Sequence, residues 1–153
     1  MSNLAEQQEP AAVPEETDYQ RATRTLIEEI RGEGHPVTGW FAGQQVLLLT
    51  TMGAKSGERR TSPLAFTRDN DRYVVIASKG GAPTHPAWFH NLLKDPTATI
   101  EVDREAFTAR AEVPDGEERQ RLWDQHVSTH PGIGEYPKKT DRVIPIVTFQ
   151  RVA

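Results

Sequence analysis

The feature that most constrains this fold is a series of short β-rich segments that are joined mainly by polar turns, with no regular alternation of strands and helices. The first segment, residues 45–51 (QVLLLTT), is an apolar run between Gly43 and Gly53, as expected for a strand that is buried on both faces. A parallel sheet needs a long crossover, usually a helix, between successive strands. The sequence therefore predicts an α+β protein, a small and mainly antiparallel barrel of about six strands flanked by about three helices.

Polar turns divide most of the remaining β-rich sequence into two hairpins. The first turn is Asp69-Asn70-Asp71, and the second lies between Asp103 and Glu105. A closing strand follows near the C-terminus, in which Pro145 should lie at an edge or a bulge. The expected strands are residues 45–51, 61–68, 72–78, 97–103, 106–114 and 143–149.

Three segments carry helix signals. Residues 19–34 place apolar side chains near helical spacing and end in glycines, which favours a first helix. A short helix should begin at Ala87 and stop at Asp95-Pro96. A third should begin after Asp115, which with Glu118 resembles a capping box.

Composition bounds the class of protein. The first 18 of the 153 residues are rich in Glu, Gln, Ala and Pro, so we expect a mobile tail at 1–18 and a single domain at 19–153. The net charge of -4 gives no overall attraction to nucleic acid. Because there is no cysteine, a redox role needs a bound cofactor. The N-terminus lacks an apolar signal segment, and the apolar run Val46–Leu49 is too short to span a bilayer, so we expect a cytoplasmic protein.

The turn at residues 53–60 (GAKSGERR) has the composition of an anion site. Its glycines let backbone N–H groups approach an oxyanion, and its three cations can add charge-assisted hydrogen bonds. A solvated hairpin turn is the alternative, because such turns are common. Residues 78–81 (SKGG) form a second cationic turn, which we expect near the first. Residues 85–91 (HPAWFHN) form an aromatic helix start that either walls a planar ligand or packs in the core.

Three motifs in order, LLLTTMGAKSGERRTSPLAF, VVIASKGGAPTHPAWFHNL and TDRVIPIVTF, resemble the deazaflavin-dependent nitroreductases, split β-barrel oxidoreductases that use coenzyme F420. The resemblance covers residues 46–149. It implies a split barrel and an enzyme that transfers hydride from reduced F420 to an electron-poor acceptor such as a quinone, an enone or a nitro compound. It further implies that the following residues bind the cofactor: Ala54, Lys55, Ser56, Arg60, Thr61, Ser62, Pro63, Leu64, Ala65, Ile76, Ala77, Ser78, Lys79, Ala87, Trp88, Phe89, His90 and Asn91.

The resemblance places the acceptor near residues 130–142 (HPGIGEYPKKTDR). Relatives that activate nitroimidazoles carry several tyrosines here, whereas this chain keeps only Tyr136, with His130 and Ile133 at the other positions. A quinone or an unsaturated carbonyl compound is therefore the favoured acceptor, and Tyr136 is the candidate catalytic residue that orients or protonates it. A loop tyrosine that packs on the barrel is the alternative for Tyr136.

Other functions remain as alternatives. An FMN-binding split-barrel protein would need fewer cations than the group Lys55, Arg59, Arg60 and Lys79, and a non-catalytic F420 binder would share the same residues. His126 and His130 lie one helical turn apart, but the set is too incomplete to predict a metal. Membrane association through the first helix is not expected because that helix lacks a consistent basic face. A homodimer is plausible for a barrel with open strand edges.

Overall fold

The computed structural model of the protein describes residues 16–37 and 41–152. Its helices are α2 (Asp18–Glu33), α3 (Ala87–Lys94) and α4 (Gly116–Thr129), with shorter 3-10 segments η1 (Lys79–Gly81) and η2 (Pro131–Lys139). Its strands are β1 (Val46–Met52), β2 (Arg59–Ala65), β3 (Thr67–Asp69), β4 (Arg72–Ile76), β5 (Thr97–Val102), β6 (Glu105–Glu112) and β7 (Ile146–Arg151).

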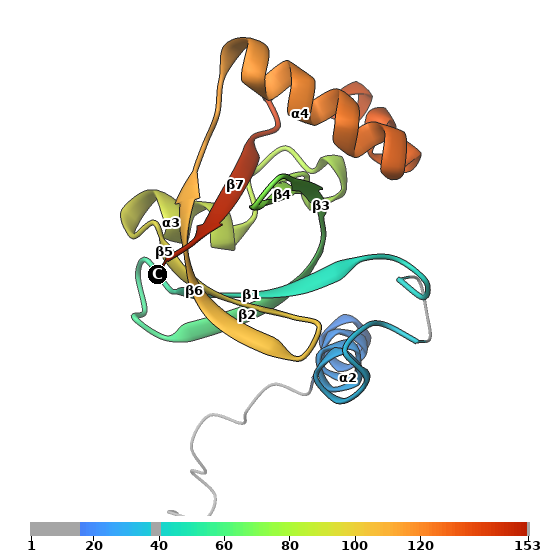
Figure 1. The fold of residues 1–153 in the computed structure, drawn as a ribbon, viewed down its shortest axis with the longest axis vertical. Helices are drawn as coiled ribbons and strands as arrows, with labels where there is room; N and C mark the ends of the chain where they lie inside the picture. The colour runs from blue at the N-terminus through green and yellow to red at the C-terminus, as the bar shows by residue number, and fades with distance from the viewer. Residues whose placement is uncertain (1–15, 38–40, 153) are drawn as a thin grey trace, which may run out of the picture.

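The strands form one antiparallel sheet in the order β2-β1-β5-β6-β7-β4-β3. Strands β2 and β3 are adjacent in sequence, with only Phe66 between them, yet they lie at opposite ends of this order. The sheet must therefore curl round on itself, as Figure 1 shows. The predicted antiparallel split barrel is confirmed. There is one strand more than expected because residues 61–68 break at Phe66, whose N–H donates to the Gln45 carbonyl at 3.1 Å.

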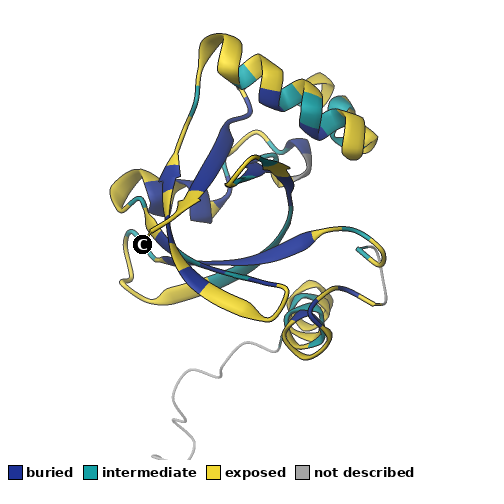
Figure 2. Cartoon of the chain, viewed as in Figure 1, coloured by how far each residue is buried: buried dark blue, intermediate teal, exposed yellow. Residues whose placement is uncertain are grey.

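Strand β1 is buried on both faces, as its sequence predicted. Leu47 and Leu49 point into the barrel core, whereas Val46 and Leu48 pack with Ile30 of α2. Figure 2 shows this division: the strands at the centre are buried, and the outer surface of α2 is exposed. The first helix therefore covers the outside of the barrel at β1.

The other two α-helices cover separate parts of the sheet. Helix α4 packs Leu122 against the outer side chains of β4 and β7, including Val74 and Ile146. Helix α3 inserts Trp88, Phe89 and other apolar residues into the barrel core. No helix among the described residues has the length and apolarity to cross a bilayer.

Local signals at the turns and helix ends were mostly read correctly. Asn70 adopts the left-handed conformation (φ 55°) that the predicted first hairpin turn needs. The capping box expected at Asp115 is wrong, because Asp115 caps α4 without a side-chain hydrogen bond. Helix α2 has a true capping box, formed by Thr17 and Gln20, and begins one residue earlier than expected.

Pro145 does not lie on an edge strand, because it precedes β7, which has a neighbouring strand on each side. Residues 1–15 of the expected tail lie outside the described residues.

An ion-pair cluster joins the β3–β4 hairpin to α4, and it makes stability depend on pH. Hydrogen bonds from Arg121 (2.9 Å) and Arg72 lower the pKa of Asp69 from 3.8 to about 2. A carboxylate with a lowered pKa stabilises the fold above its unfolded pKa and loses that contribution as the pH falls toward the folded value. We expect Asp69→Asn to lower the unfolding free energy by about 1–2 kcal/mol at pH 7, allowing for the exposure of Arg121.

The difference from wild type should shrink between about pH 4 and pH 2, as measured by urea unfolding across this range. Asp71→Asn, an exposed carboxylate in the same turn, is the matched control. A constant difference down to pH 2 would contradict the ion-pair explanation.

Candidate functional site

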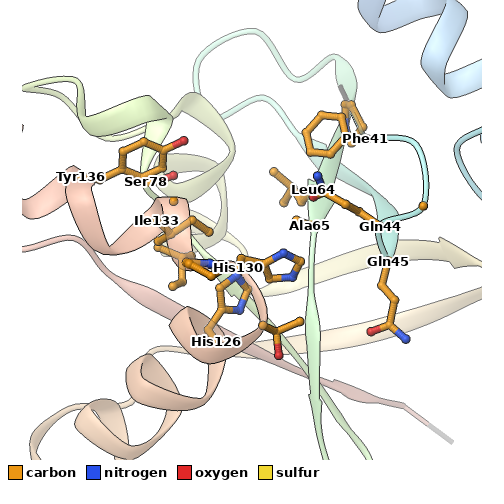
Figure 3. A pocket seen from close by; sticks show the side chains of 16 residues that line it. Phe41, Gln44, Gln45, Leu64, Ala65, Ser78, His126, His130, Ile133 and Tyr136 are labelled. Carbon is orange, nitrogen blue, oxygen red and sulfur yellow. The ribbon is translucent and has the colours of Figure 1, made fainter. Parts of the chain in front are cut away.

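A cavity of about 490 Å³ lies where the end of β2 meets the loop before β1, the end of α4 and η2. Figure 3 shows Tyr136, Ile133 and Ser78 along one side, and Phe41, Leu64 and Ala65 along the other. The lining residues are Phe41, Gly43, Gln44, Gln45, Pro63, Leu64, Ala65, Ile76, Ser78, His126, Thr129, His130, Pro131, Gly132, Ile133 and Tyr136. The cavity is walled by apolar side chains with a few polar groups, which is typical of a site for a small organic molecule.

The cavity brings together residues that the sequence analysis assigned to two different partners. From the predicted cofactor set it contains Pro63, Leu64, Ala65, Ile76 and Ser78. The candidate catalytic residue on the acceptor side and its two neighbours also line it: Tyr136, His130 and Ile133. The sequence analysis missed Phe41, Gln44, Gln45, His126 and Thr129 as lining residues. Only the histidine spacing drew attention to any of these, because the others carry no motif.

Close packing of η1 against η2 holds Tyr136 beside the barrel. Gly81 has φ 83°, and a Cβ at this position would lie 3.0 Å from the Lys139 Cβ and 3.3 Å from the Tyr136 carbonyl oxygen. A side chain at position 81 would therefore be strained and would push the two segments apart. Because position 81 is a glycine, η2 with Tyr136 can pack closely against η1 and form one wall of the cavity.

Arg142 fixes the loop that supplies Ser78. Its guanidinium donates to the carbonyl oxygens of Ser78 (2.6 Å), Ala82 (2.8 Å) and Ala77 (3.2 Å), and it lies 2.9 Å from His85 Nδ1. Burial lowers the pKa of His85, with a further contribution from the Arg142 charge, so Nδ1 is free to accept this bond. These contacts give Arg142 a structural role as the anchor of the loop.

The turn between β1 and β2 is tightly closed by its own hydrogen bonds. Gly53 N–H donates to the Glu58 carbonyl at 2.7 Å, and Gly57 N–H donates back to the Gly53 carbonyl at 2.9 Å. The Ser56 hydroxyl accepts from Glu58 N–H at 3.1 Å. Among the described residues, the N–H groups of Lys55 and Ser56 have no acceptor. These two amides, with the exposed Lys55 side chain, are therefore the donors that the turn offers to an anion.

Asn91 of α3 clamps this turn to the barrel. Its Oδ1 accepts from Ala54 N–H at 2.9 Å, and its Nδ2 donates to Thr51 Oγ1 at 3.0 Å. Lys94, one turn later, donates to the Ala54 carbonyl at 2.8 Å. Asn91 is buried, so it acts here as a support for the turn.

The cations expected to form a basic group differ in their surroundings. Arg60 pairs with Glu58 at 2.9 Å on the exposed surface, which weakens its availability to a ligand. Lys79 donates to Thr84 at 3.2 Å. The turn that holds Lys55 is bound to the C-terminal half of α3, whereas Lys79 belongs to the loop that precedes α3. The two cationic turns thus flank α3.

The remaining predicted cofactor residues lie in three kinds of place. Thr61 and Ser62 are half-buried on β2, where the Thr61 hydroxyl contacts Thr50 at 2.8 Å. Of the predicted cofactor residues on α3, Ala87 and His90 are exposed. The buried ones are Ala77, Trp88 and Phe89, which belong to the barrel core.

Two histidines lie side by side among the polar residues of the cavity wall. The rings of His126 and His130 have centroids 4.8 Å apart. Burial, and then the neighbouring His130, lower the pKa of His126 to about 3, so His126 is neutral near pH 7. No third His, Cys, Asp or Glu among the described residues joins them to make a metal-binding group.

Comparison with known proteins identifies the family. Residues 15–151 match the family described as F420H(2)-dependent quinone reductase. An F420H(2)-dependent quinone reductase of Mycobacterium tuberculosis is 38% identical over 122 residues, which cover 77% of this chain and 79% of that protein. A solved F420-H2 dependent reductase is 38% identical with a TM-score of 0.64, covering 69% of this chain and 94% of that one.

A further solved structure, described as a domain-swapped dimer, is 35% identical with a TM-score of 0.66 and covers 83% of this chain and 96% of that one. The shared fold, the match across nearly all of the described chain and these identities agree with the three motifs found in the sequence. The chain belongs to the F420H(2)-dependent quinone reductase family.

Proposed function

We propose that the protein reduces a quinone in the 490 Å³ cavity, with reduced coenzyme F420 as the hydride donor. Family membership makes the protein an F420H2-dependent oxidoreductase, so FMN and a purely binding role are set aside. One observation supports this site: Tyr136 lines the same cavity as five residues of the predicted cofactor set, Pro63–Ala65, Ile76 and Ser78. The bound cofactor supplies the hydride, and the protein's task is to orient the acceptor and stabilise the charge that develops on it.

The described residues fit a long anionic cofactor. Strand β2 is an edge strand that runs from the basic turn, with its free Lys55 and Ser56 amides, to the apolar cavity wall at Ala65. Arg60 and Ala65 are five positions apart along the strand, a distance of roughly 16 Å. We infer that the anionic tail binds at the turn, that residues 61–65 lie alongside the linker, and that the ring lies against Leu64, Ala65 and Ile76.

The direct test is a calorimetric titration of the full chain with F420 and, in parallel, with FMN. Micromolar affinity for F420 with negligible affinity for FMN is the expected result, followed by quinone-dependent oxidation of reduced F420. Preference for FMN, or binding of F420 without turnover of any quinone, would contradict the proposal.

Lys55→Ala should weaken F420 binding about tenfold to a hundredfold, because it removes one charge-assisted hydrogen bond to the tail. Arg110→Ala, an exposed cation on β6, is the matched control and should leave the affinity unchanged. Titration at two salt concentrations checks the charge, since the loss should be smaller at high salt. If Lys55→Ala binds F420 as tightly as Arg110→Ala does, then the turn has no part in binding.

The molecule also has a surface suited to a second copy of the chain. A groove of about 670 Å³ runs between α2, Phe41 and Pro63 of the edge strand β2, and Tyr19 beside it is 80% exposed. The similarity to a domain-swapped dimer supports a homodimer. We propose this groove as its contact surface because Tyr19, Leu26, Phe41 and Pro63 line it. We expect a dimer mass in light scattering and a shift toward monomer for Tyr19→Glu. A monomer at all concentrations would contradict this assembly.

We infer that the protein works in the cytoplasm and does not bind membranes. The described cations of α2 are mostly paired: Arg21 with Asp18, Arg24 with Glu16 and Arg31 with Glu101. Little free positive charge is left to attract anionic lipid. The full chain should stay in the supernatant when sedimented with anionic vesicles, and co-sedimentation would contradict this inference.

A further inference from the structure

The last turn of α4 contains a hydrogen-bonding group that the protein itself does not satisfy. His126 is 0% exposed, and its Nδ1 lies 3.2 Å from Thr67 Oγ1. Its Nε2 is buried and has no hydrogen-bond partner among the described residues. Leaving a buried polar atom unpaired destabilises the folded state. An apolar residue would fill this position without that cost, so the histidine at a cavity wall indicates a polar partner that joins it.

The neighbouring residues determine which nitrogen of His126 carries the hydrogen. Gln125 Nε2 donates to the Arg68 carbonyl at 2.8 Å and lies 3.5 Å from Thr67 Oγ1. Among the described residues, His126 Nδ1 is the acceptor within reach of the Thr67 hydroxyl hydrogen, so we assign Thr67 as the donor in this pair. Since His126 is neutral, its single N–H is on Nε2, and the unsatisfied atom is a donor.

His130 is the neighbour of this donor in the cavity wall. Its ring centroid is 4.8 Å from that of His126, and it is half-buried in the cavity wall (Figure 3). Its Nε2 is 3.4 Å from the Phe66 carbonyl, which is the outer limit of a hydrogen bond. A hydrogen bond from His126 Nε2–H to His130 Nδ1 would require the His130 ring to leave this weak contact and turn its own N–H toward the cavity.

We propose that a carbonyl oxygen of the acceptor completes a hydrogen-bond chain that runs from Thr67 through His126 and His130. Thr67 Oγ1–H donates to His126 Nδ1, His126 Nε2–H donates to His130 Nδ1, and His130 Nε2–H donates to the acceptor oxygen. This inference rests on the proposed function and adds to it the residues that bind the acceptor's carbonyl oxygen. In this hydrogen-bond chain His130 is a catalytic residue, next to the candidate Tyr136, and His126 and Thr67 are positioning residues.

The chain stabilises charge without moving a proton along it. Hydride addition to a quinone brings two electrons and one hydrogen, and it leaves negative charge on a carbonyl oxygen. An N–H donor held beside that oxygen stabilises the charge, and a neutral imidazole can serve as such a donor. The oxygen then takes one proton from solvent, which completes the hydroquinone.

The first test compares two acceptors, both with reduced F420. His130→Phe should lower kcat for a quinone by about 10–100-fold, the size of a lost donor to a developing oxyanion. Turnover of a phenazinium dye, which accepts hydride without a carbonyl oxygen, should fall by no more than about threefold. His130→Gln keeps an N–H donor and should recover part of the quinone rate. His35→Phe, the same change at an exposed histidine outside the cavity, is the matched control.

The second test is nitrogen NMR of histidine-labelled protein without cofactor. Wild-type His126 should show one neutral tautomer with its hydrogen on Nε2, Thr67→Val should give a mixture, and Thr67→Ser should restore the single form. Adding a quinone should shift the resonances of both rings. Unshifted rings, or equal losses of quinone and dye turnover in His130→Phe, would overturn the chain. If wild type reduces neither acceptor, the proposed function fails, while the NMR result still judges the hydrogen-bond chain.

Discussion

Arg142→Ala should lower the unfolding free energy by about 3 kcal/mol, because it leaves three carbonyl oxygens in a half-buried loop without their donor. The same change should weaken F420 binding by about a hundredfold, since the loop carries Ser78 and Lys79 and precedes α3. Urea unfolding and calorimetric titration measure the two effects. The reason for the size is geometric: one guanidinium holds Ala77, Ser78 and Ala82 together with His85.

Arg142→Lys is the informative comparison. A lysine keeps the charge, but its compact ammonium cannot match the planar fork that reaches all of these acceptors. We therefore expect Arg142→Lys to lose at least half of the stability that Arg142→Ala loses. If lysine restores both stability and affinity, then Arg142 acts through its charge, and the loop-anchor explanation is wrong.

Features of the fold that depend on local sequence were predicted well. The β3–β4 hairpin follows from Asp69-Asn70-Asp71, where Asn70 takes the left-handed conformation, and the double burial of β1 follows from its unbroken apolar run. The break between β2 and β3 at Phe66 was not predicted, because it depends on how far the whole sheet curls. The capping box expected at Asp115 failed for a different reason: residue types alone do not determine which rotamer a side chain adopts.

In the candidate site, too, local motifs were predicted from the sequence, whereas contacts between distant segments were not. The predicted residues on β2 and the loop after β4 reach one cavity with Tyr136, because the curl of the sheet brings its two ends together (Figure 1). The acceptors of Arg142 lie 57 to 65 positions away in sequence, and the Thr67 partner of His126 lies 59 away. No local pattern carries such pairings, so only the folded structure reveals them.

Asn91→Leu should have the second large effect, and it separates support of the turn from packing. Leucine has a similar shape, yet it leaves Ala54 N–H and the Thr51 hydroxyl without their partner. We expect a loss of about 2–3 kcal/mol in unfolding free energy and at least a tenfold loss in F420 affinity, because the freed turn no longer presents its amides.

Thr51→Val is the matched variant, because it removes the partner on β1 and keeps the bond from Asn91 to Ala54. It should lower stability but leave F420 affinity within about twofold of wild type. In the double variant the stability losses should be less than additive, since both changes break the same hydrogen bond. If Asn91→Leu and Thr51→Val weaken F420 binding equally, then the barrel core as a whole controls affinity, and the clamp on the Lys55 turn has no separate role.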